Sequence, residues 1–122
     1  MDSRGQQGSE LPGDVPVIAL TGEIDLAVAP SLQERLDDLL ARGSSTIAVD
    51  LLGATFLDSV ALGVLVGSLD ECRKAGGDLH LVVADPRILK VLQITGLSNT
   101  FPIHSTRQSP ASEQGSTGEE GQ

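Results

Sequence analysis

Four short β-rich runs alternate with three helical patterns along this chain, and this alternation restricts the fold more than any other feature. The expected strands are residues 17–21, 46–52, 79–84 and 101–104. The expected helices begin near Pro30, Val60 and Pro86, and glycine-containing segments at Gly43, Gly76 and Gly96 end them. Strands joined by helices pair in parallel through right-handed crossovers, so the order predicts a small α/β sandwich.

The strand patterns also predict how the helices are arranged. In residues 46–52, Ile47, Val49 and Leu51 share one face, and Ala48 and Asp50 share the other. Residues 79–84 alternate in the same way. A sheet with helices on both faces has strands that are apolar throughout, so alternation favours helices packed mainly on one face.

The two ends of the chain differ from its centre in composition. Residues 1–14 and 107–122 are rich in Gly, Ser, Gln and Glu and poor in large apolar side chains. Such segments bury too little surface to offset chain entropy, so we expect disorder at both ends, with an acidic C-terminal tail. The folded domain is then residues 15–106.

Charge and composition exclude several classes of protein. The net charge is −9, with 17 acidic and 8 basic side chains, whereas a nucleic-acid-binding protein needs a basic face. No apolar run approaches the roughly 20 residues of a membrane span, and the N-terminus has no signal-peptide core. Cys72 is the single cysteine, which fits a reducing compartment. We expect a cytoplasmic protein.

Catalytic and metal-binding patterns are absent from the sequence. His80 and His104 are isolated from each other and from Cys72, and no spacing matches a metal site. The sequence favours an inert, half-buried Cys72 over a reactive thiol. No phosphate-binding loop, dinucleotide fingerprint or nucleophile elbow is present. We therefore expect no enzyme activity, no cofactor and no metal.

The segment from Phe56 to Gly67, FLDSVALGVLVG, carries the functional signal. It passes from the end of a strand through Asp58 and Ser59 into an unusually apolar helix. The N-terminus of a helix favours negative charge, so Ser59 is either a helix cap or a switch. The excess of apolar residues indicates a protein-binding surface or additional core, and Gly63 and Gly67 leave one line of the helix open to close approach.

Two stretches, GEID (Gly22 to Asp25) and FLDSVALGVLVG, together with the helix PRILKVLQITGL and the ending FPIH, resemble the STAS-domain anti-sigma factor antagonists. These are the SpoIIAA-like anti-anti-sigma factors, here of the actinobacterial type. The resemblance covers residues 17–104 and implies a STAS-type domain with a mixed β-sheet. It also implies a first strand before Val17 and a last helix after His104.

The resemblance further implies a partner-switching function. The unphosphorylated domain would bind an anti-sigma factor, often a serine kinase of the GHKL type, and thereby regulate sigma-factor-dependent transcription. Phosphorylation of Ser59 would release it, and a PP2C-type phosphatase would reverse the reaction. Asp58 and Asp25 would support the phosphorylation site by holding the hydroxyl in place. Val60 and Ala61 occupy the positions where the family usually has Ser or Thr followed by Gly. The expected partner-binding residues are Glu23, Ile24, Asp25, Asp58, Ser59, Val60, Ala61, Gly63, Val64 and Gly67.

Two other functions remain open at this point. One is a STAS domain that is never phosphorylated and serves as a scaffold or as an accessory module in lipid transport. The other is a small nucleotide-binding enzyme, for which the sequence offers no motif. An open sheet edge would also permit a weak homodimer.

Overall fold

The structure is a computed structural model that describes residues 14–106, where strands and helices alternate as predicted. The strands are β1 (Val17–Ile24), β2 (Ile47–Leu57), β3 (Leu79–Val82) and β4 (Ile103–His104). The helices are α1 (Ala29–Ala41), α2 (Ser59–Lys74) and α3 (Pro86–Ile94), and a short 3-10 helix, η2 (Leu97–Asn99), precedes β4. The disorder predicted for both ends concerns residues outside the described part, except Asp14, which lies in an exposed turn.

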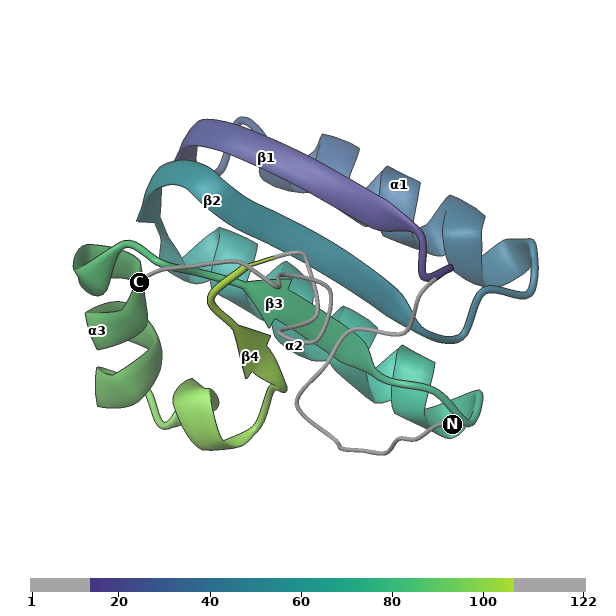
Figure 1. Ribbon diagram of the computed structural model, residues 1–122. Coiled ribbons are helices and arrows are strands. Elements are labelled where there is room, and N and C mark those ends of the chain that lie inside the picture. Colours follow the sequence, from purple (N-terminus) through teal and green to yellow (C-terminus); the bar gives the residue numbers. More distant parts are fainter. Residues whose placement is uncertain (1–13, 107–122) are drawn as a thin grey trace.

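The strands form one sheet in the order β1-β2-β3-β4, and each neighbouring pair is parallel (Figure 1). The α/β class is therefore confirmed. The predicted mixed sheet is not found among the described strands, because a helical crossover joins every one of these pairs. The first strand before Val17 and the last helix after His104 that the resemblance implied would fall largely outside the described residues.

Helices α1 and α2 lie on the same face of the sheet (Figure 1), as the alternating strands predicted. The core lies between this face and the helices. It combines inward residues of the strands, such as Ile18, Val49 and Leu81, with Leu32 of α1 and Leu65 of α2. Helix α3 contacts β2 and contributes two fully buried side chains to the same core, Ile88 and Leu92. No helix within residues 14–106 is long and apolar enough to cross a membrane.

Both β1 and β2 run further than the sequence predicted. The first strand was expected to end at residue 21, but β1 continues to Ile24, and Gly22 adopts a φ of 79° inside the strand. The pairing register of β1 with β2 shifts twice, between Ala19 and Thr21 and between Gly22 and Glu23. Such bulges absorb additional residues on one strand and change which side chains face the core.

These shifts break the alternation of β2 after Leu51. Ala54 and Leu57 face the core, while Phe56 between them is 49% exposed. Gly53 fits closely here, because a Cβ at this position would lie 2.7 Å from the Thr21 Cγ2 and the Thr21 side chain would have to move. β1 and β2 stay paired beyond the end of β3. The two shifts turn Ala54 toward the core, whereas Phe56 and Leu57 keep the outward and inward positions that alternation from Leu51 predicts.

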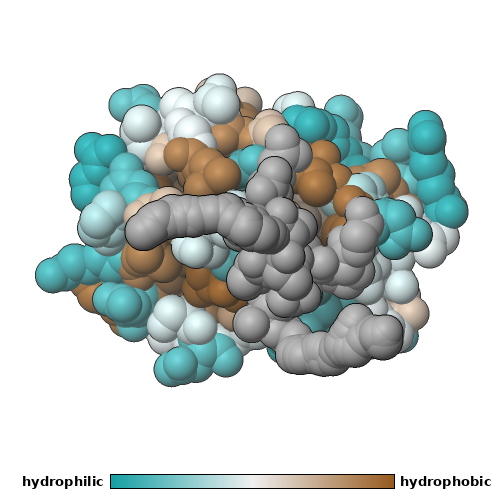
Figure 2. All heavy atoms as spheres, in the orientation of Figure 1, coloured by the Kyte–Doolittle hydropathy of each residue, from teal (hydrophilic) through white to brown (hydrophobic). Residues whose placement is uncertain are grey.

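The face of the sheet away from α1 and α2 holds a buried polar pair. His80 of β3 and His104 of β4 lie with Nδ1 and Nε2 2.9 Å apart, and each side chain is largely buried. The prediction that the two histidines are isolated from each other is wrong, because parallel pairing of β3 with β4 brings them together. In the same orientation as Figure 1, apolar side chains reach the surface in patches between hydrophilic ones (Figure 2).

Candidate functional site

The predicted site forms where β1 and β2 end side by side. Ile24 pairs with Leu57, so the residues that follow them, Asp25 and Asp58, emerge at the same edge of the parallel sheet. The Asp58 N–H donates to the Ile24 carbonyl oxygen at 3.1 Å. Two segments more than 30 residues apart, GEID and FLDS, are thus joined by the sheet itself, as the resemblance implied.

Asp58, and not Ser59, caps helix α2. Asp58 has extended backbone angles (φ −98°, ψ 178°), and its Oδ1 accepts a hydrogen bond from the Ala61 N–H at 2.9 Å. This is the usual geometry of a helix N-cap. Ser59 is the first residue of the helix. The reading of Ser59 as the cap is therefore wrong, because the preceding carboxylate already satisfies the free N–H of the first turn.

The Ser59 side chain is exposed, and its hydroxyl forms no hydrogen bond within residues 14–106. The Asp58 carboxylate contacts Ala61 and, through Oδ2, the Leu26 N–H at 2.8 Å. Asp25 Oδ1 accepts from the Ala27 N–H of its own turn at 3.0 Å. Asp58 and Asp25 were expected to hold the serine hydroxyl in place, but neither carboxylate contacts it. Both accept hydrogen bonds from backbone N–H groups instead. The hydroxyl is left accessible at a helix N-terminus.

Leu26 is a surface residue that the sequence analysis missed. It lies in the turn after Asp25, and the residue is 66% exposed. Val60, in the first turn of α2, is 42% exposed. The polar step at Asp58 and Ser59 therefore has an apolar side chain on each side, one from each segment. The sequence did offer a signal for this residue. Leu26 is a large apolar residue in the turn before α1 and is not part of the apolar stripe of that helix.

The other predicted contact residues fall into three groups. Exposed are Glu23, Val60, Gly63 and Gly67; Asp25, Asp58 and Val64 are partly buried. Ile24 and Ala61 are 1% and 0% exposed, so their side chains belong to the core and offer a partner no surface. Ile24 faces inward from β1, and Ala61 faces the sheet from α2. The prediction that the side chains of Ile24 and Ala61 contact a partner is therefore wrong.

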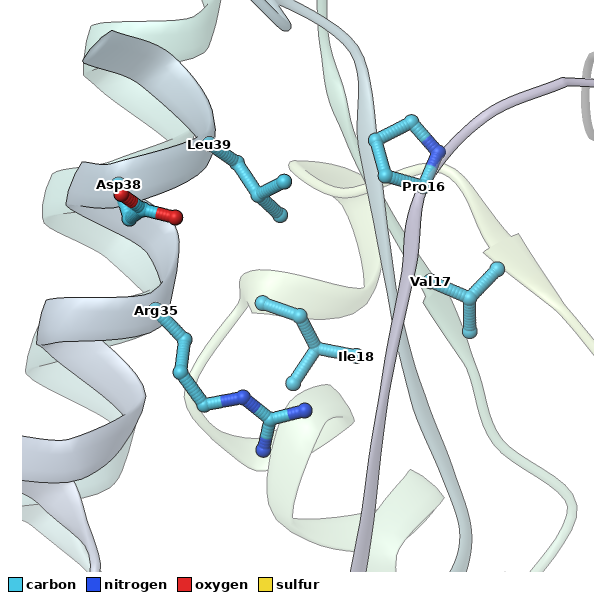
Figure 3. Close-up of a pocket in the computed structure, with 6 residues that line it drawn as sticks. All are labelled: Pro16, Val17, Ile18, Arg35, Asp38 and Leu39. Carbon is cyan, nitrogen blue, oxygen red and sulfur yellow. The ribbon is translucent and has the colours of Figure 1, made fainter. Parts of the chain in front are cut away.

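Other parts of the described structure offer less chemistry. Cys72 is fully buried, and burial, followed by Asp78 and Glu71, raises the pKa of its thiol, which keeps it protonated. Within residues 14–106, no three His, Cys, Asp or Glu side chains gather in a way that could hold a metal. A groove of about 220 Å³ lies between the start of β1 and the second half of α1, at the opposite end of β1 from Asp25 (Figure 3). It is lined by Pro16, Val17, Ile18, Arg35, Asp38 and Leu39.

Comparison with known proteins agrees with the fold and with the motifs. The family model of the STAS domain matches residues 9–109. The anti-sigma-B factor antagonist of Bacillus subtilis is 35% identical over 86 residues, which cover 70% of this chain and 78% of that protein. The anti-sigma-B factor antagonist of Listeria monocytogenes is 33% identical, with 70% and 75% covered.

Solved structures give the same answer. An anti-sigma factor antagonist from Mycobacterium paratuberculosis superimposes with a TM-score of 0.69 at 30% identity, covering 79% of this chain and 82% of that one. The phosphorylated form of SpoIIAA from Bacillus has a TM-score of 0.59 at 26% identity, covering 73% and 81%. Together with the β1 and β2 ends that form the site, these matches show that the chain belongs to the STAS domain family and is similar to its anti-sigma factor antagonists.

Proposed function

We propose that this protein is an anti-sigma factor antagonist controlled by phosphorylation of Ser59. In its unphosphorylated form it binds an anti-sigma factor through the turn after β1 and the first turns of α2, and so frees a sigma factor. The observation that carries this proposal is the accessible Ser59 hydroxyl at the start of α2, flanked by exposed Leu26 and Val60. The curated relatives named as anti-sigma-B factor antagonists support the same role.

The chemistry of the switch lies in the partner enzymes. A GHKL-type serine kinase, which is also the anti-sigma factor, transfers the γ-phosphoryl group of ATP to Ser59 Oγ; the hydroxyl proton leaves and ADP is released. A PP2C-type phosphatase hydrolyses the phosphoserine and restores the hydroxyl. This chain supplies the acceptor and the docking surface and catalyses neither step.

The physical basis of release is a charge placed in an apolar contact. Phosphoserine adds about −1.5 to −2 charges at neutral pH. At the N-terminus of α2 the domain tolerates this charge, because the helix dipole favours an anion there. In a contact formed by Leu26 and Val60 the same group must lose its water, which opposes binding. Binding is lost without refolding of the domain.

The test is incubation of the purified protein with its anti-sigma factor kinase and ATP, followed by intact-mass measurement. One phosphoryl group is expected on the wild-type chain and none on Ser59→Ala. A phosphoryl group that persists in Ser59→Ala contradicts the assignment of the site. If the protein binds the anti-sigma factor but gains no phosphoryl group, it acts as a STAS antagonist without this switch.

A further inference from the structure

The Asp58 carboxylate forms one more hydrogen bond than a helix cap needs. Oδ1 accepts from the Ala61 N–H at 2.9 Å, which completes the cap of α2. Oδ2 accepts from the Leu26 N–H at 2.8 Å, although Leu26 lies 32 residues earlier in the chain. A capping serine has one oxygen on a shorter side chain, whereas the two bonds of Asp58 use two separate oxygens. Asp58 therefore fastens the turn after β1 to the start of α2.

The turn after β1 is held by hydrogen bonds to Asp25 within the turn and to Asp58 outside it. The Asp25 carbonyl oxygen accepts from the N–H groups of Val28 and Ala29, each at 2.9 Å, and the Asp25 side chain accepts from Ala27. These bonds leave the Leu26 N–H without a partner inside the turn, and Asp58 supplies one. The backbone of Leu26 is thus fixed at the point where its side chain extends into solvent.

Leu26 is one of the most exposed large apolar side chains in the described structure, at 66%. A leucine on a fixed backbone loses little further backbone entropy when a partner covers it, so its burial contributes to binding more fully. Its apolar neighbour across the Asp58 bridge, Val60, is also exposed. The bridge joins the two segments of the proposed docking surface.

We propose that Asp58 is a positioning residue that presents Leu26 as an apolar anchor for the anti-sigma factor. This inference rests on the proposed function and adds to it a contact residue and the group that places it. Asp58 acts through Leu26 and need not touch the partner, because both of its oxygens are already engaged within the domain. The partner surface that fits here is an apolar pocket that receives one branched aliphatic side chain.

The test separates the two hydrogen bonds of Asp58. Asp58→Ser keeps a good N-cap, since serine and aspartate cap helices about equally well, but removes the oxygen that reaches Leu26. We expect the melting temperature to change little, the Leu26 amide to exchange with solvent faster, and affinity for the purified anti-sigma factor to fall about tenfold when measured without ATP. Asp85→Ser, at the cap of α3, is the matched control and should bind like the wild type.

A double-mutant cycle distinguishes positioning from direct contact. Leu26→Ala alone should lower affinity about tenfold or more. If Asp58 acts through Leu26, the double variant binds about as weakly as Leu26→Ala alone. Additive losses, or wild-type affinity in Asp58→Ser with a released Leu26 amide, would overturn the inference while leaving the proposed function in place. If the wild-type protein does not bind the anti-sigma factor, the proposed function fails, and this inference fails with it.

Discussion

The N-termini of α2 and α3 are both capped by an aspartate, but the two carboxylates bond to different partners beyond the helix that they cap. Each helix follows a parallel strand, and each begins after an aspartate in extended backbone conformation, Asp58 or Asp85. Asp85 Oδ1 accepts from the Arg87 N–H at 2.8 Å, and its other oxygen receives the Arg87 guanidinium at 2.7 Å. That carboxylate is neutralised within two residues. Asp58 forms no ion pair within residues 14–106, and its second oxygen accepts a hydrogen bond from the Leu26 N–H.

The difference shows how one capping motif serves two purposes. With a cation two residues away, the cap is complete in itself, and the α3 terminus is a local structural feature. Without the cation, the carboxylate bonds to a distant turn and assembles a surface from two segments. The next residue differs in the same sense: Pro86 has neither N–H nor hydroxyl to offer, whereas Ser59 exposes a hydroxyl.

The largest expected effect is a negative charge at the α2 terminus. Ser59→Asp should weaken binding to the anti-sigma factor by about a hundredfold or more, because a carboxylate must be desolvated in the apolar contact. Its melting temperature should stay near that of the wild type, because an acid in the first turn suits the helix dipole. Calorimetric titration and thermal denaturation measure the two effects. Equal affinity in both proteins would contradict the charge-based switch, and Ser59→Ala, which should bind normally, is the control.

Removal of each cap side chain tests whether the two termini differ in function. Asp58→Ala should lose about 1 kcal/mol of stability, or roughly 4–8 °C in melting temperature, and should also lose binding. Asp85→Ala should lower the melting temperature without changing affinity for the anti-sigma factor. If both variants lose binding to the same extent, the effect comes from general destabilisation and the contrast between the caps disappears.

The buried histidine pair sets a pH dependence that neither cap explains. Burial, followed by His104, lowers the pKa of His80 from its ordinary value of 6.5, and Asp78 opposes this only in part; Asp50 lies on the same face. The unfolded chain therefore binds the proton more readily than the folded one, and stability falls as the pH drops below about 6.5. Thermal denaturation between pH 8 and pH 5 measures it. The slope should flatten in His80→Gln, and an unchanged slope would assign the effect to another group.

A substitution at Gly63 of α2 should affect the stability of the domain and its binding to the anti-sigma factor in opposite directions. A Cβ at this exposed helical position meets nothing within 4 Å, so Gly63→Ala should stabilise the domain by about 0.5–1 kcal/mol. If the anti-sigma factor approaches this line of the helix closely, the same methyl group weakens binding several-fold. Denaturant unfolding and calorimetry give the two values. A variant that is more stable and binds as tightly as the wild type would place the contact away from Gly63.

The smallest effect concerns Asp85. The hydrogen bonds from Arg87 lower the pKa of the Asp85 carboxyl. A depressed pKa contributes stability above the unfolded value of about 3.9, and this contribution is lost as the pH falls through the folded value. The stability difference between the wild type and Asp85→Asn should therefore shrink in acid below about pH 4. A difference that stays constant with pH would mean that the pair with Arg87 does not affect folding.

Features that depend on a few neighbouring residues could be predicted from the sequence. The order of strands and helices follows from hydrophobic periods, and the start of α3 follows from Asp85 and Pro86, because caps and first-turn prolines act within one helical turn. Ser59 was identified because a serine between a strand and an apolar helix, combined with GEID upstream, forms a recognisable motif. Its phosphorylation stays a prediction.

Features that depend on the register between distant segments could not be predicted and became visible only in the folded chain. The two bulges in the pairing of β1 with β2 turn Ala54 toward the core, and no local pattern in residues 52–57 signals them. Pairing of β3 with β4 brought His80 to His104, and the common ending of β1 and β2 brought Asp58 to Leu26. Each contact joins residues more than 20 positions apart, so its geometry is fixed only when the sheet sets which strand ends lie together.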